Sequence, residues 1–197
     1  MKDTKYNGII AAMFAGGAMI AALAPKFLLF SKLPIIGLVL AVVIFAIAAM
    51  LADKKRNNPS RVVAYAMMSY SFGELLSIVC GDPDITSHAM FTTAAAVAIT
   101  YVASLIDPGW VCEGKLPRIM LLGVAVAEIA SHLVGKTTLS LAAIVIEVGL
   151  AAILSHRWCV ANNSAKRTED AACRGAFLLF GSPLNYFAEA LGLNIFY

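Results

Sequence analysis

The sequence predicts an all-α, polytopic membrane protein with about seven transmembrane helices. Of its 197 residues, 60% are hydrophobic and 14% are charged, whereas soluble domains carry about 25% charged residues. The charges also gather in short runs between long apolar stretches. A soluble domain would lack the polar surface to cover its core, so we expect lipid to cover the chain as one integral membrane domain, 1–197.

Individual membrane spans are indicated by long apolar runs. A helix needs about 17–25 residues to cross hydrocarbon, where the backbone must satisfy its own hydrogen bonds. Seven runs are candidates, of which the fifth and sixth are short: 8–29, 35–52, 62–80, 89–106, 119–134, 138–155 and 176–197. The short Gly135-Lys136-Thr137 segment predicts a tight helical hairpin between the fifth and sixth runs. The first run resembles a signal peptide, but six further runs favour its retention as a span.

The basic residues predict the orientation, because short cytoplasmic loops are enriched in Lys and Arg. One set of loops, with the N-terminus, carries twelve basic residues, and the other carries three: Lys26, Lys32 and Lys136. The N-terminus is therefore expected in the cytoplasm. Compact loops favour a bacterial inner membrane over a eukaryotic endomembrane.

Several function classes are disfavoured. The basic residues form no stripe that would track phosphates, so we expect no nucleic-acid partner. The cysteines have no CxxC spacing, which indicates neither a zinc site nor a disulfide framework. No HxxxH or HExxH pair, nucleophile elbow or P-loop is present. We therefore expect no enzyme, no cofactor and no bound metal. The four cysteines are Cys80, Cys112, Cys159 and Cys173.

Four glutamates within the apolar runs are the main functional candidates: Glu74, Glu128, Glu147 and Glu189. A charge at the bilayer centre costs at least about 2.5–3.5 kcal/mol on insertion scales, so such residues are functional candidates by default. They would line an aqueous path for a cation or gate it by titration. In the alternative interpretation, each is neutral or hydrogen-bonded and holds helices together.

The histidines offer further candidates. Glu128 and His132 lie four residues apart, so they share one face of a helix and would form a hydrogen bond or pass a proton. His88 and His156 lie near span ends, where a histidine is more often an interfacial residue than a ligand.

Small residues recur at helix-packing spacing. Ser69, Gly73 and Ser77 form a four-residue ladder on the third run. Such surfaces let backbones approach closely in lipid, which predicts a compact bundle.

Four segments resemble the Bax inhibitor-1 family, also called the transmembrane Bax-inhibitor-motif family. One of them is the sixth run, which from Ser140 through Gly149-Leu150 to Arg157 has the family's length and its exit into a basic loop. The third run contains Asn58-Pro59-Ser60, Ala64-Tyr65 and Ser71-Phe72-Gly73-Glu74-Leu75-Leu76-Ser77, and the fourth contains Ala89-Met90-Phe91-Thr92-Thr93-Ala94. The stretch 175–187 is similar, without gaps, to the family's Gly-Ala-Leu-x-Leu-Tyr-Leu-Asp-Phe-Ile-Asn-Leu-Phe. The identical positions there are Gly175, Ala176, Leu179, Asn185 and Phe187.

This resemblance implies seven helices around a central, hydrophobic C-terminal helix, and a pH-sensitive calcium leak with protection against cell death. It also implies a pore latch made of two aspartates that share a proton. Here Ser182 stands at the seventh-helix aspartate position, and the sixth-helix position falls near Leu154 or Ser155. Serine cannot share a proton in this way. Either Glu147, Glu189 or His156 takes the titratable role, or the leak is not gated.

Three hypotheses follow. The first is a Bax-inhibitor-like protein that leaks or regulates calcium through a path lined by Glu74, which matches the family's third-helix glutamate, with Glu147 and Glu189. The second is a non-conducting protein that binds other membrane proteins through its small-residue faces. The third is a small secondary transporter or intramembrane enzyme that uses Glu128 and His132. In all three, the lipid bilayer is a partner.

Overall fold

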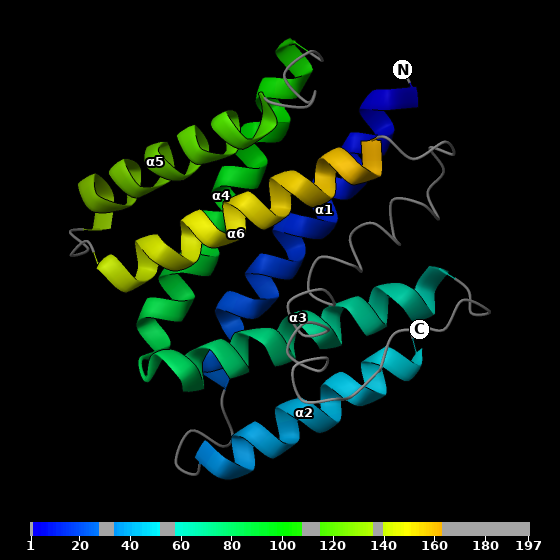
Figure 1. Ribbon diagram of the computed structural model, residues 1–197, viewed down its shortest axis with the longest axis vertical. Coiled ribbons are helices and arrows are strands. Elements are labelled where there is room, and N and C mark those ends of the chain that lie inside the picture. The colour runs from blue at the N-terminus through cyan, green and yellow to red at the C-terminus, as the bar shows by residue number, and fades with distance from the viewer. Residues whose placement is uncertain (1, 28–33, 52–57, 108–114, 136–139, 163–197) are drawn as a thin grey trace.

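The computed structural model describes residues 2–27, 34–51, 58–107, 115–135 and 140–162. These residues form an all-helical bundle, which confirms the predicted class (Figure 1). The helices are α1 (Lys2–Leu23), the 3₁₀-helix η1 (Ala24–Phe27), α2 (Pro34–Leu51), α3 (Asn58–Cys80), α4 (Pro83–Ile106), α5 (Leu116–Gly135) and α6 (Leu141–Asn162).

Five of these helices are long and apolar enough to cross a membrane. The candidate spans are Thr4–Lys26, Pro59–Cys80, Pro83–Ile106, Leu116–Gly135 and Leu141–Cys159. A sixth apolar stretch, Ile35–Ala48 in α2, is shorter. The chain is therefore a multi-pass integral membrane protein. The predicted seventh span, 176–197, lies outside the described residues, so the seven-helix count and the central C-terminal helix stay predictions.

The helices pack in a defined order across the bundle. α1 and α4 contact each other extensively and form its middle. On one side α1 packs against α3, and α3 packs against α2, while on the other side α4 packs against both α5 and α6 (Figure 1). α5 and α6 also pack against each other, as expected for the two helices joined across residues 136–139. α4, α5 and α6 thus form a three-helix group in mutual contact.

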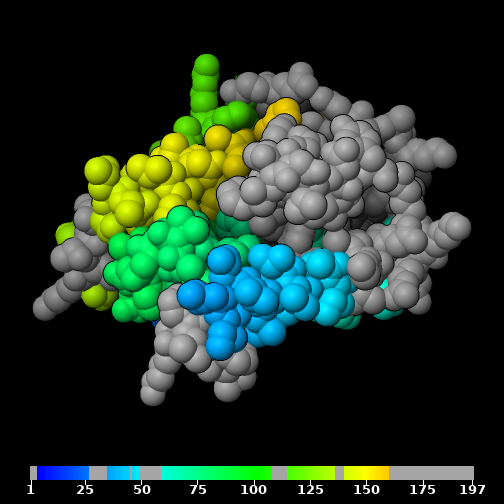
Figure 2. Space-filling view, turned by 60° about the horizontal axis from the view of Figure 1, so that its bottom comes forward, coloured from blue at the N-terminus to red at the C-terminus, as the bar shows by residue number. Residues whose placement is uncertain are grey.

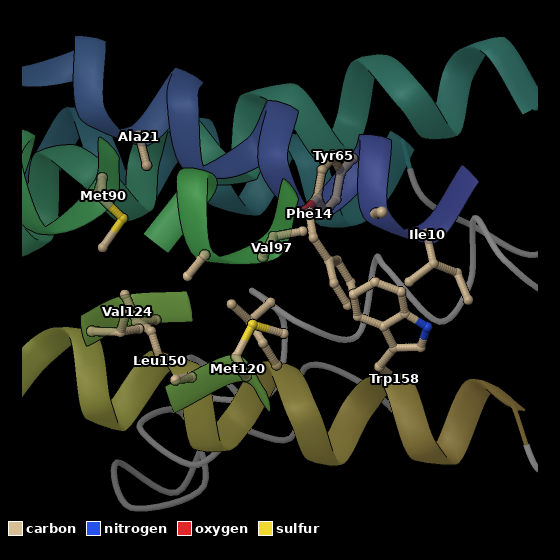
Figure 3. Close-up of a cluster of buried hydrophobic side chains, with 14 of the residues drawn as sticks. Ile10, Phe14, Ala21, Tyr65, Met90, Val97, Met120, Val124, Leu150 and Trp158 are labelled. Atoms are coloured by element: carbon tan, nitrogen blue, oxygen red, sulfur yellow. The ribbon is translucent and has the colours of Figure 1, made fainter. Parts of the chain in front are cut away.

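A buried apolar cluster joins α6 to α1. Trp158 is fully buried, and its ring meets that of Phe14 edge to face, with centroids 6.0 Å apart (Figure 3). Its indole N–H donates a 2.9 Å hydrogen bond to Oδ1 of Asn7. A buried indole is stable when its N–H finds such an acceptor. Met120, Val124 and other buried side chains continue the cluster between α4, α5 and α6.

Small residues allow the closest helix contacts, as the sequence predicted. A Cβ added at Gly73 would lie 2.7 Å from Cα of Ala21, so α3 and α1 approach backbone to backbone there. Gly123 of α5 lies in the same way against Ala96 of α4, where an added Cβ would be 3.0 Å from the carbonyl oxygen. Ser69 and Ser77 of the predicted ladder are buried with Gly73. This ladder therefore serves packing within the chain.

The outer surface of the bundle is apolar. Large hydrophobic side chains are exposed on each of the six α-helices that the structure describes, including Ile35, Val79, Ile106, Leu133 and Val145. Exposure of so many large hydrophobic side chains is unusual for a soluble monomer. It is the surface that lipid covers in a membrane protein.

The turn between α3 and α4 follows from its sequence. Gly81 has a φ of 68°, a left-handed conformation suited to glycine after a helix C-terminus, and its N–H donates to the Ser77 carbonyl. Asp82 then caps α4, because its side chain accepts a 2.8 Å hydrogen bond from the Asp84 N–H. Pro83 occupies the first turn, where its missing N–H costs nothing.

These caps make α4 start at Pro83, well before the apolar run that begins at Ala89. Apolar runs mark the part of a helix in hydrocarbon, whereas caps mark where the helix begins. The earlier start places Asp84, His88 and Thr92 on one helix with a spacing of four residues. Residues so spaced share one helix face.

Candidate functional site

Three potential metal-binding side chains converge inside the bundle. His88 comes from α4, Glu128 from α5 and Glu147 from α6, and one ligand atom of each lies within 4.8 Å of the others. These three helices are in mutual contact, which brings together residues that are far apart in sequence. We call His88, Glu128 and Glu147 the HEE cluster.

The HEE cluster lies about 8–10 Å inside one end of the bundle, the end where α4 and α6 begin and α5 ends. With a rise of about 1.5 Å per residue, His88 is about 8 Å from the start of α4 and Glu147 about 9 Å from the start of α6. Glu128 is about 10 Å from the end of α5. The three residues therefore lie at a common depth, within the helices that are candidate membrane spans.

Glu128 is held by two side chains of α4. Its Oε1 lies 2.7 Å from Nε2 of His88 and 3.2 Å from Oγ1 of Thr92, whose hydroxyl donates to it. His88 and Thr92 are one helical turn apart, so both reach the same carboxylate. An ion pair of this kind, when His88 is protonated, satisfies one carboxylate of the cluster.

Glu147 is the unusual member of the cluster. Its side chain is 0% exposed, and neither carboxylate oxygen has a hydrogen-bond partner within the described part of the chain. A buried carboxylate without hydrogen bonds is costly, and a second carboxylate nearby makes it more so. Two glutamates and one imidazole therefore need a further positive charge, from a proton or from a bound cation.

His88 is the most exposed member of the HEE cluster and lies nearest the start of α4. The His88 side chain is 22% exposed, whereas that of Glu128 is 11% exposed. Asp84, one turn before His88 on the same face of α4, is exposed. Figure 2 shows the beginning of α4, in green, at the surface between α6 and α2. The row Asp84, His88, Thr92 thus leads from the helix start to the buried carboxylates.

Glu74 is buried in a different part of the bundle. It is 4% exposed, and it lines a small cavity with Tyr70 of α3 and with α2. The α2 residues of this cavity are Gly37, Leu40, Ala41 and Ile44. Oε2 of Glu74 has no hydrogen-bond partner in the described part of the chain. Both Glu74 and Glu147 face the interior, as the sequence predicted, but they do not share one site.

The other candidate residues lie outside the HEE cluster. Glu128 was expected to act with His132; in the structure Glu128 contacts His88 of α4, and the His132 side chain is exposed. His156 is also exposed, about 13 Å along α6 from Glu147. Glu189, Ser182 and Asn185 fall outside the described residues.

His88 was considered as a ligand from the sequence, but an interfacial role was favoured, and its place beside Glu128 and Glu147 was not foreseen. A search for metal ligands at i, i+4 spacing tests one helix at a time, whereas the HEE cluster takes one residue from each of three helices. The Asp82-Pro83 cap was the available signal. It moves the start of α4 forward, which makes Asp84, His88 and Thr92 a polar row on a membrane helix.

Comparisons of this chain with protein-family models, curated proteins and solved structures found no match.

Proposed function

We propose that this multi-pass membrane protein moves a cation across the bilayer, as a leak or a carrier, and that the HEE cluster binds the cation on its way. The observation that carries this proposal is Glu147. It is fully buried with both oxygens unpaired, next to a second carboxylate, in a helix long enough to span a membrane. Intramembrane carboxylates of this kind mark ion and proton pathways.

A cation would enter from the end of the bundle where α4 and α6 begin. Asp84 is exposed at that end and attracts cations, and His88 lies one turn deeper. The distribution of Lys and Arg predicts that this end lies outside the cytoplasm and the N-terminus inside. The polar row then delivers the cation to Glu128 and Glu147.

The relation to the Bax inhibitor-1 family remains part of the proposal. It is supported by the third-run and C-terminal motifs and by the buried position of Glu74, which matches the family's third-helix glutamate. If the relation holds, the cation implied is calcium, and the protein would regulate membrane calcium and stress or cell-death responses.

The alternative of a non-conducting interaction protein, which the missing aspartate pair motivates, cannot use the ladder of Ser69, Gly73 and Ser77 as its binding face. Ser69 and Ser77 are buried, and Gly73 packs against Ala21 of α1 within the same chain.

Cation flux into proteoliposomes tests the proposal. Purified full-length protein is reconstituted, and uptake of calcium and of other divalent cations is followed with an entrapped indicator. The Glu128→Gln/Glu147→Gln variant keeps side-chain shape but loses both charges. We expect it to lose at least about nine-tenths of the protein-dependent flux, because the cation then meets no anionic ligand at the cluster.

The matched control is Asp107→Asn, the same carboxyl-to-amide change at an exposed residue at the other end of α4. This variant is expected to keep wild-type flux. Glu74→Gln tells whether the path also includes the cavity beside α2. Equal flux from the wild type and the double variant, or no flux of any cation from folded protein, overturns the proposal.

A further inference from the structure

We propose that the HEE cluster is a binding site for a divalent first-row transition-metal ion of the Zn²⁺ type, rather than for calcium. This inference rests on the proposed function, since it names the class of cation that the site takes. It is carried by the convergence of one imidazole nitrogen and two carboxylates, all within 4.8 Å, and by the unpaired oxygens of buried Glu147.

The donor set decides between classes of cation. Imidazole nitrogen suits zinc, copper, iron and nickel, and carboxylate oxygen binds zinc as well. Calcium instead takes six to eight oxygen ligands at about 2.3–2.6 Å. The cluster supplies a nitrogen, two carboxylates and the nearby Thr92 hydroxyl, so calcium would lack ligands in this buried place.

The distances fit a four-coordinate ion after a small adjustment. Zinc binds nitrogen and oxygen at about 2.0–2.2 Å, which puts tetrahedral ligand atoms about 3.4 Å apart. The ligand atoms here lie within 4.8 Å of one another, with His88 and Glu128 at 2.7 Å. A bound ion would separate His88 from Glu128 slightly and draw Glu147 inward.

Three protein ligands leave one coordination position open. Structural zinc sites use four protein ligands, whereas sites that exchange a ligand keep the fourth position for water or substrate. An open position suits an ion that must enter and leave. Thr92 would act as a positioning residue, because its hydroxyl holds Glu128, as outer-shell groups hold metal-binding carboxylates.

Zinc binding to the full-length protein in detergent tests the inference. The protein is first stripped with a chelator, and Zn²⁺ and Ca²⁺ are then titrated separately by calorimetry. We expect one Zn²⁺ per chain from this site, bound on the order of 100-fold more tightly than Ca²⁺. His88→Ala and Glu147→Gln should each weaken Zn²⁺ binding at least about tenfold.

The matched controls keep every cysteine, so binding of zinc to thiols is the same in all variants. His156→Ala removes an exposed histidine from the distant part of α6, and Asp107→Asn removes an exposed carboxylate. Both should bind Zn²⁺ as the wild type does. Size-exclusion profiles of each variant establish that it is folded. The Glu147→Gln change also removes a buried charge, so it should not unfold the bundle.

The outcomes separate this inference from the proposed function. Zinc affinity that is unchanged in folded His88→Ala and Glu147→Gln, or calcium bound as tightly as zinc, overturns the metal site. If cation flux still depends on Glu128 and Glu147 in that case, the transport proposal stands alone. If zinc binding requires His88 and Glu147 but the protein transports no cation, the metal site is supported and the transport proposal is overturned.

Discussion

Nε2 of His88 lies 2.7 Å from Oε1 of Glu128, although 40 residues separate the two in the chain. This contact joins α4 to α5 inside a multi-pass membrane protein, and α6 adds the buried carboxylate of Glu147 beside it. A hydrogen-bonded pair alone would be a common way to hold two helices together. The second, unpaired carboxylate makes the group a place for a positive charge.

The Thr92 hydroxyl is expected to matter through Glu128. Thr92→Val keeps the shape of the side chain but removes the hydroxyl that donates to Glu128 Oε1. We expect zinc affinity to fall by about 10–100-fold, the usual effect of losing an outer-shell hydrogen bond. Thr93→Val is the control, because the Thr93 hydroxyl bonds the Ala89 carbonyl of its own helix. Equal affinities in the two variants would show that Thr92 does not position Glu128.

Gly73 is expected to be intolerant of any side chain. In Gly73→Ala the new Cβ would lie 2.7 Å from Cα of Ala21, so α1 and α3 must move apart. We expect the variant to lose about 1–3 kcal/mol of stability, as overpacked sites do. Thermal unfolding followed by size-exclusion fluorescence measures this. Gly149→Ala, with no atom within 4 Å of the added Cβ, should unfold at or above the wild-type temperature.

The Trp158 indole is expected to couple α6 to α1. Trp158→Phe removes the hydrogen bond to Asn7 while most of the ring packing on Phe14 is kept. We expect a loss of about 1–2 kcal/mol. In a double-mutant cycle with Asn7→Ala, the coupling energy should be about 0.5–1.5 kcal/mol. Strictly additive effects would mean that the bond contributes nothing to stability.

The two ends of α4 are expected on opposite sides of the membrane. In a background without native cysteines, Asp84→Cys should react with an impermeant thiol reagent from outside intact cells. Lys115→Cys should react only after the cells are opened, because the basic loops are predicted to be cytoplasmic. The reverse pattern would show that the predicted orientation is wrong, and reaction of both from outside would show that α4 does not cross the bilayer.

The bundle was largely predictable from the sequence, because lipid imposes long apolar helices and glycine contacts such as that of Gly73 leave a spacing pattern. The interior positions of Glu74 and Glu147 were predictable for the same reason, since buried charge is expensive in hydrocarbon. The contact between Glu128 and His88 could not be predicted from the sequence. Spacing along a helix can suggest His132, but it carries no information on which neighbouring helix supplies His88.

The coordination of bound zinc tests the central claim most directly. X-ray absorption at the zinc edge, measured on the full-length protein loaded with one equivalent of Zn²⁺, reports the ligand atoms and their distances. We predict nitrogen and oxygen ligands at about 2.0–2.2 Å. The imidazole signal should disappear in His88→Ala and persist in His156→Ala. A first shell dominated by sulfur at about 2.3 Å, or an imidazole signal that survives the loss of His88, would contradict the account.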